Sequence, residues 1–69
     1  MTTQVLEYLI AIEEEHSLTR AAERFYLSQP SLSYHLARAE QELKVKLCQK
    51  EGGSLLPTEE GIIFFNAAR

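Results

Sequence analysis

Apolar residues recur at helical spacing in the first part of the chain. Leu6 lies three residues before Leu9 and four before Ile10, and Leu9 lies three before Ile12. This spacing places apolar side chains on one face of a helix. We therefore predict an amphipathic helix over residues 4–15, with the acidic run at residues 13–15 on its solvated face.

A second, shorter helix is predicted after Ser17. The Ser17 hydroxyl can cap the first turn, and a new apolar stripe follows at Leu18, Ala21, Ala22 and Phe25. We expect this helix to end near Tyr26. A helix this short is stable only when it packs against others, and the two alanines allow a close approach.

The clearest helix start in the chain lies at residue 28. Ser28 supplies a hydroxyl cap, and Pro30 falls in the first turn, where its missing N–H breaks no helical hydrogen bond. One apolar stripe follows, at Leu32, Leu36, Ala39 and Leu43. We predict a third helix over residues 29–43. Its opposite face carries side chains able to hydrogen-bond, namely Ser31, Ser33, Tyr34, His35 and Arg38.

Beyond the third helix the period changes from helix to strand. Residues 45–50 alternate between the two faces, with Val45 and Leu47 on one side, and Gly52-Gly53 supplies the positive φ of a tight turn. A two-stranded hairpin is predicted here, and it must lean on the helices because it is marginal alone. Thr58, followed by two glutamates, then marks the start of a last helix, in which Gly61 suggests close packing.

Three helices, a hairpin and another helix are the element order of a winged helix-turn-helix, a mainly α fold. Residues 17–33, SLTRAAERFYLSQPSLS, closely resemble the signature of the LysR-type transcriptional regulators, which reads roughly S-F-T-x-A-A-x-x-L-x-x-S-Q-P-A-L-S. The resemblance continues through residues 39–43, 46–47 and 56–61, and so spans essentially the whole chain.

The resemblance implies a sequence-specific DNA-binding domain at residues 1–57 and the start of a dimerising linker helix at residues 58–69. The expected partner is double-stranded DNA, bound by a homodimer or higher oligomer. A small-molecule effector is expected only through a C-terminal domain that is absent from this chain. The apolar surface of the linker start would partly pack on the domain and partly meet a partner subunit; the alternative is an ordinary fourth core helix. The residues concerned are Ile62, Ile63, Phe64 and Phe65.

By the same resemblance, the helix at residues 29–43 enters the major groove. Gln29 would read adenine through its carboxamide, and Pro30 would touch a thymine methyl group or the sugar backbone. Ser28 and Ser31 would bond phosphates, which exposed N–H groups at a helix start also attract. The alternatives are an exposed turn glutamine, a proline that only starts the helix, and a Ser28 that only caps it.

Further along this helix, Ser33, Tyr34 and Arg38 would track the groove and its phosphates. Tyr34 departs from the family, where arginine is common, and His35 replaces a frequent glutamine. We expect these positions to set the operator sequence of this protein, so no base preference is transferred from relatives.

At the start of the second helix, Thr19 and Arg20 resemble family residues that contact phosphates. On the hairpin, Lys50 stands where the family usually has an arginine and is the best cation of the wing for DNA. Arg24 would be a further contact, or else a surface ion-pair partner of Glu23 or Glu40. The wing matches least well, because Glu51 lies near its tip where relatives commonly carry arginine. Cys48 stands at a position that is usually phenylalanine, and we expect a small buried side chain there.

The formal net charge of −3 argues at first against a nucleic-acid partner. The charge is unevenly spread, however, because residues 17–50 carry six basic and three acidic side chains while both flanks are acidic. Since charges beyond about 8–10 Å are screened, a ligand would respond to the local face. The acidic total keeps one alternative open, a winged-helix protein-interaction module without DNA binding.

The size and composition of the chain argue against several other classes of protein. A chain of 69 residues forms one small domain with little room for an enzyme pocket, so we expect no enzyme and no cofactor. One cysteine and two histidines do not suggest a metal site. No apolar run approaches the roughly 18–20 residues of a membrane span, so a cytoplasmic protein is expected.

Overall fold

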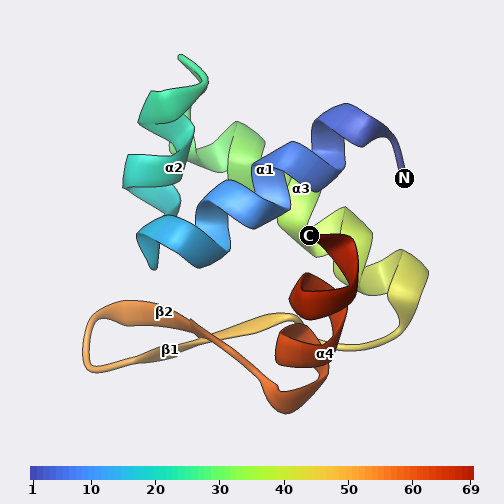
Figure 1. Cartoon of the computed structure of the whole chain (residues 1–69). Helices are drawn as coiled ribbons and strands as arrows, with labels where there is room; N and C mark the ends of the chain where they lie inside the picture. Colours follow the sequence, from blue (N-terminus) through green and yellow to red (C-terminus); the bar gives the residue numbers. More distant parts are fainter.

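The computed structural model describes residues 1–69. Three helices come first, then a hairpin and a fourth helix (Figure 1). The elements are α1 (Thr3–Glu15), α2 (Leu18–Arg24), α3 (Gln29–Leu43), β1 (Cys48–Glu51), β2 (Ser54–Pro57) and α4 (Glu59–Ala68). The predicted winged helix-turn-helix is confirmed, including the bounds of the third helix.

Hydroxyl side chains fix where the four helices begin. Each accepts a hydrogen bond from the backbone N–H three residues further on, at N···O distances of 3.0–3.2 Å. The caps are Thr2, Ser17, Ser28 and Thr58. Three of them were predicted from the sequence, and a side-chain oxygen satisfies a helix-start N–H group at each.

Two predicted boundaries were wrong. Helix α2 ends at Arg24, because Tyr26 adopts a left-handed φ of 57° and the Leu27 N–H bonds the Ala22 carbonyl at 3.0 Å. This is a Schellman ending, in which a left-handed residue closes the helix. The first strand starts at Cys48 rather than Val45, because the Leu47 N–H donates to Glu40 Oε2 at 2.7 Å and not to a strand partner.

The core lies where α1, α2 and α3 meet the inner face of the hairpin and α4. Its members are Leu9, Ala11, Ile12, Ala21, Ala22, Leu32, Leu36, Ala39, Leu47, Cys48, Leu55 and Phe65. Leu43 was predicted to belong to this stripe and is instead 38 % exposed. It occupies the last residue of α3, where the chain turns away toward the wing.

The hairpin is anchored to the helices at two points, and Figure 1 shows its turn reaching out from them. β1 and β2 pair antiparallel, with Glu51 opposite Ser54 across the Gly52-Gly53 turn. The Leu55 N–H donates to the His16 carbonyl at 2.9 Å, which ties the wing to the corner between α1 and α2. At its other end, the Thr58 N–H donates to the Leu47 carbonyl at 3.0 Å.

Ion pairs hold the acidic run at the end of α1, which is therefore not simply a solvated face. Arg24 Nη1 lies 2.9 Å from Glu14 Oε1 and 3.4 Å from Glu15 Oε2, so its partners are not the two glutamates considered from the sequence. Arg69 pairs with Glu13 and links the end of α4 to α1. None of the helices combines the length and the apolar character needed to cross a membrane.

Candidate nucleic-acid interface

The exposed N-terminus of α3 is the centre of the candidate interface. Gln29, Pro30 and Ser31 are all exposed on its first turn. The Ser28 oxygen caps this turn by accepting the Ser31 N–H at 3.2 Å, and its hydroxyl lies 2.9 Å from Ser31 Oγ. The capping role of Ser28 is therefore present, and the first-turn N–H groups keep the positive end of the helix dipole open to an anion.

Three of the predicted DNA-contact residues meet in one hollow. A depression of about 150 Å³ lies between the start of α2, the start of α3 and the wing, and Thr19, Gln29 and Lys50 all line it. These residues are far apart in the sequence and come together because the Leu55–His16 hydrogen bond docks the wing on the α1–α2 corner. The hollow brings a hydroxyl, a carboxamide and an ammonium group to one place.

A second group of predicted residues extends along the outer side of α3. Tyr34 is 58 % exposed and Arg38 is exposed as well, while Ser33 is half-buried. Arg38 Nη1 donates a hydrogen bond to the Tyr34 hydroxyl oxygen at 3.3 Å. This hydrogen bond and, more weakly, the negative charge of Glu42 raise the pKa of the Arg38 guanidinium, which stays fully charged.

His35 belongs to a row of aromatic rings rather than to the open face. Its half-buried ring lies 5.2 Å from the Tyr8 centroid and 5.6 Å from the Tyr34 centroid. Tyr8 in turn meets Phe25 edge to face at 4.9 Å. Such contacts fix ring orientations. The row therefore connects α1, the end of α2 and the outer side of α3.

The charges of the folded chain are arranged differently from their order in the sequence. Three basic side chains are paired with carboxylates of this chain, namely Arg24, Lys46 and Arg69. The pairs of Arg24 and Arg69 partly neutralise the negative charge at the end of α1. The other basic side chains have no carboxylate within 4.0 Å; they are Arg20, Arg38, Lys44 and Lys50. Three of these four are in the predicted contact set, so the unpaired positive charge lies on α2, α3 and the wing.

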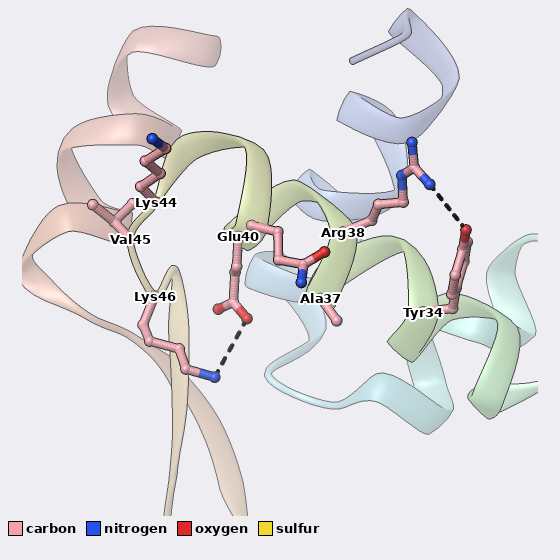
Figure 2. Close-up of a pocket in the computed structure, with 8 residues that line it drawn as sticks. Tyr34, Ala37, Arg38, Glu40, Lys44, Val45 and Lys46 are labelled. Carbon is pink, nitrogen blue, oxygen red and sulfur yellow. Dashed lines mark hydrogen bonds and ion pairs between the residues drawn. The ribbon is translucent and has the colours of Figure 1, made fainter.

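A larger hollow flanks the second half of α3 (Figure 2). It measures about 570 Å³ and lies between this helix and the loop that follows it. Tyr34 and Arg38 form one flank, and on the other Glu40 pairs with Lys46 at 3.8 Å. Glu40 also accepts the N–H groups of Leu47 and Cys48, so this carboxylate holds the loop in place.

The four apolar residues 62–65 of α4, predicted to contribute to dimerisation, differ in burial. Phe65 is 1 % exposed and belongs to the core, and Phe64 is partly buried beside it. Ile62 is 48 % exposed and Ile63 is 71 % exposed. The outward apolar surface of α4 is therefore formed mainly by the two isoleucines.

Cys48 is buried, as expected for a small core side chain. Burial, helped by the nearby charge of Glu40, raises the pKa of its thiol to about 11. The reactive thiolate form is therefore scarce at neutral pH. No three His, Cys, Asp or Glu side chains lie together in a way that could hold a metal ion.

The fold and this surface define a winged helix-turn-helix domain, with α2 and α3 as the helix-turn-helix and the hairpin as the wing. Residues 3–62 match the model of a family described as bacterial regulatory helix-turn-helix protein, lysR family. The chain belongs to this family.

Two relatives illustrate how the chain compares with whole regulators. It is 41 % identical over 66 residues to the HTH-type transcriptional regulator DgcR of a Pseudoalteromonas species, covering 96 % of this chain and 23 % of the relative. It is 36 % identical over 69 residues to the DNA-binding transcriptional dual regulator OxyR of Escherichia coli K12, and this match covers 100 % of this chain and 23 % of OxyR. The chain thus spans about a quarter of the length of these relatives.

Solved structures agree with the fold throughout the chain. The BenM DNA-binding domain, in a crystal structure with benA site 1 DNA, matches with a TM-score of 0.92 and 34 % identity, over 99 % of this chain and 76 % of that one. The CbnR DNA-binding domain in complex with DNA matches with a TM-score of 0.92 and 30 % identity, over 100 % and 79 %.

Sequence reasoning missed the ion pairs of Arg24 and the hollow lined by Thr19, Gln29 and Lys50. The partners of Arg24 lie nine and ten residues before it, across the corner between α1 and α2. Neither spacing follows the period of one helix, so only the angle between the two helices could reveal the pairing.

Proposed function

We propose that this chain is the DNA-reading domain of a transcription regulator that acts as a dimer in the cytoplasm. Helix α3 enters the major groove of a specific duplex, N-terminus first. One observation carries the proposal, namely the open N-terminus of α3 with Thr19 of α2 and Lys50 of the wing beside it in one hollow. Membership of the LysR family supports it.

The residues of the interface have distinct roles in this proposal. Gln29 reads a base edge through its carboxamide, and Pro30 packs against a thymine methyl group or a sugar. Thr19, Arg20 and Lys50 bind phosphates on both sides of the groove, and Ser31 adds a hydroxyl contact. The contact continues along α3 through Ser33, Tyr34 and Arg38. His35 contributes indirectly, because its ring packs on the Tyr34 ring and supports it.

Dimerisation through α4 completes the proposal. Ile62 and Ile63 face outward and would bury their side chains against the same surface of a second copy. Two α3 helices would then read successive major grooves, about 34–36 Å apart, of an inverted repeat. Each domain alone binds weakly, since few cations contribute and Glu51 lies near the wing tip.

The test begins with selection of bound duplexes from a randomised library, followed by binding measurements on the enriched sequence at several salt concentrations. The logarithm of affinity should fall linearly with the logarithm of salt, by about 0.9 for each phosphate neutralised. Arg20→Ala should reduce this slope by about 0.9. Arg24→Ala is the matched control, because that arginine is engaged with Glu14 and Glu15, and it should leave the slope unchanged.

Three results would contradict the proposal. They are a wild-type chain that enriches no sequence even when dimerisation is enforced, an affinity that does not depend on salt, and an Arg24→Ala slope reduced as much as that of Arg20→Ala. If the chain keeps its fold and binds a protein partner but no duplex, the result would instead favour a winged-helix protein-interaction module.

A further inference from the structure

Tyr34 and Arg38 form a hydrogen-bonded pair one turn apart on the outer side of α3 (Figure 2). The guanidinium donates through Nη1 to the tyrosine hydroxyl at 3.3 Å. Side chains on a helix tilt toward its N-terminus, and this bond draws the guanidinium further in that direction. The cation is thereby held over the turn that precedes Arg38, closer to the end of α3 that carries Gln29.

The tyrosine is itself held in place by its neighbours. Its ring meets the ring of His35 at 5.6 Å and an interplanar angle of 70°. His35 is half-buried and packs against Tyr8 of α1 at 5.2 Å. The Tyr34 ring that carries this acceptor therefore packs on a half-buried neighbour that reaches α1, although the Tyr34 side chain is itself 58 % exposed.

The guanidinium keeps most of its hydrogen-bonding capacity. One of its five N–H donors is used by Tyr34, and no carboxylate lies within 4.0 Å of Arg38. Guanine offers two acceptors, N7 and O6, on its major-groove edge, whereas adenine offers one acceptor and one donor. The planar fork of N–H donors fits the two acceptors of the guanine edge, and a guanidinium already held in place loses less freedom when it binds there.

We propose that Tyr34 is a positioning residue that holds Arg38 for reading guanine in the major groove. The inference deepens the proposed function and rests on it. It assigns a sequence-determining role to Tyr34 and Arg38 as a pair. The hydroxyl contributes by removing rotational freedom from Arg38 before DNA arrives, so that less is lost on binding.

The experiment uses the whole chain and a library of duplexes with a randomised central segment. Four proteins are compared: wild type, Tyr34→Phe, Arg38→Ala and Tyr26→Phe. Tyr34→Phe removes only the acceptor and keeps the ring on His35. Tyr26→Phe is the matched control, because it deletes the same hydroxyl from a tyrosine that is 97 % exposed on the turn before α3. Thermal unfolding of each variant checks that its fold is kept.

Wild type should enrich a motif with a guanine in each half-site that Arg38→Ala no longer selects. Loss of a bidentate arginine contact corresponds to about 5- to 160-fold in preference at that base pair. Tyr34→Phe should weaken the same preference by about 3- to 10-fold and leave the other positions of the motif as they were, while Tyr26→Phe should select the wild-type motif.

Two results would overturn the inference while leaving the proposed function intact. In one, Tyr34→Phe selects guanine as strongly as wild type does. In the other, Tyr34→Phe weakens every position of the motif equally, which is the behaviour of a general contact. A wild-type chain that enriches no motif would overturn the proposed function, and this inference with it.

Discussion

Replacing Gly61 by alanine should destabilise the domain, although alanine is the better helix former. Gly61 is buried in the first turn of α4, and a Cβ atom built on it would lie 2.0 Å from the Leu47 carbonyl oxygen and 3.0 Å from its carbon. Ordinary van der Waals contact starts at 3.4 Å, so the backbone of one element must move by more than an ångström. The obstacle is backbone, which cannot rotate away as a flexible side chain can.

The magnitude follows from what this movement disrupts. The segment at Leu47 and the start of α4 are joined by the Thr58 N–H to the Leu47 carbonyl at 3.0 Å and by the Thr58 hydroxyl to the Lys46 carbonyl. Each lost hydrogen bond costs about 1 kcal/mol and overpacking costs about 1–3 kcal/mol. After a gain of about 1 kcal/mol from helix propensity, the free energy of unfolding should fall by about 2–4 kcal/mol.

Urea unfolding followed by circular dichroism at 222 nm measures this change. Ala67→Gly, at an exposed position of the same helix, is the control, and it should cost about 0.5–1 kcal/mol through propensity alone. If Gly61→Ala unfolds at the same urea concentration as wild type, or at a higher one, the close packing of α4 on Leu47 is not what determines glycine at this position.

Three further predictions concern stability and assembly. Cys48 should make the free energy of unfolding fall between pH 9 and about 11, because its pKa is raised in the native state and the unfolded chain therefore releases this proton first. The loss, up to about 1.4 kcal/mol per pH unit, should appear in urea titrations as a difference between wild type and Cys48→Ala, and equal pH profiles would refute it. Tyr26→Gly should raise the melting temperature by about 4 °C or more, because glycine relieves a left-handed φ of 57°, and a lower melting temperature would contradict this reasoning. Ile63→Asp should shift the sedimentation of the concentrated protein toward monomer and leave the melting temperature of the monomer unchanged. Asn66→Asp, on the same helix, should leave the sedimentation as it is in wild type.

Local signals made most of the fold predictable. Ser28 and Pro30 define the start of α3 by satisfying or omitting N–H groups that no helix can bond internally, so the start of α3 could be placed to the residue. The end of α2 was placed less well. A left-handed tyrosine at position 26 carries no sequence mark comparable to glycine, and the hydrogen bonds that close the helix became visible only in the structure.

The candidate site was predictable as a set of residue types and unpredictable as an arrangement. The motif around Gln29 indicated which residues to examine, but Tyr34 and His35 depart from it, and their roles depend on packing with Tyr8. The partners of Arg24 could not be inferred either. They lie on another helix, and an ion pair between helices depends on the crossing angle rather than on spacing along the chain.

The sequence by itself determined the order of elements, the helix starts, the basic middle segment and the family, because caps, periodicity and motif are properties of neighbouring residues. The tertiary structure decided which charges remain free and which residues share a surface. Docking of the wing through Leu55 and His16 brings Thr19, Gln29 and Lys50 into one hollow, and folding pairs the acids of α1 with arginines. A net charge of −3 is therefore compatible with a positive face, since electrostatic interactions act between groups that are close in space.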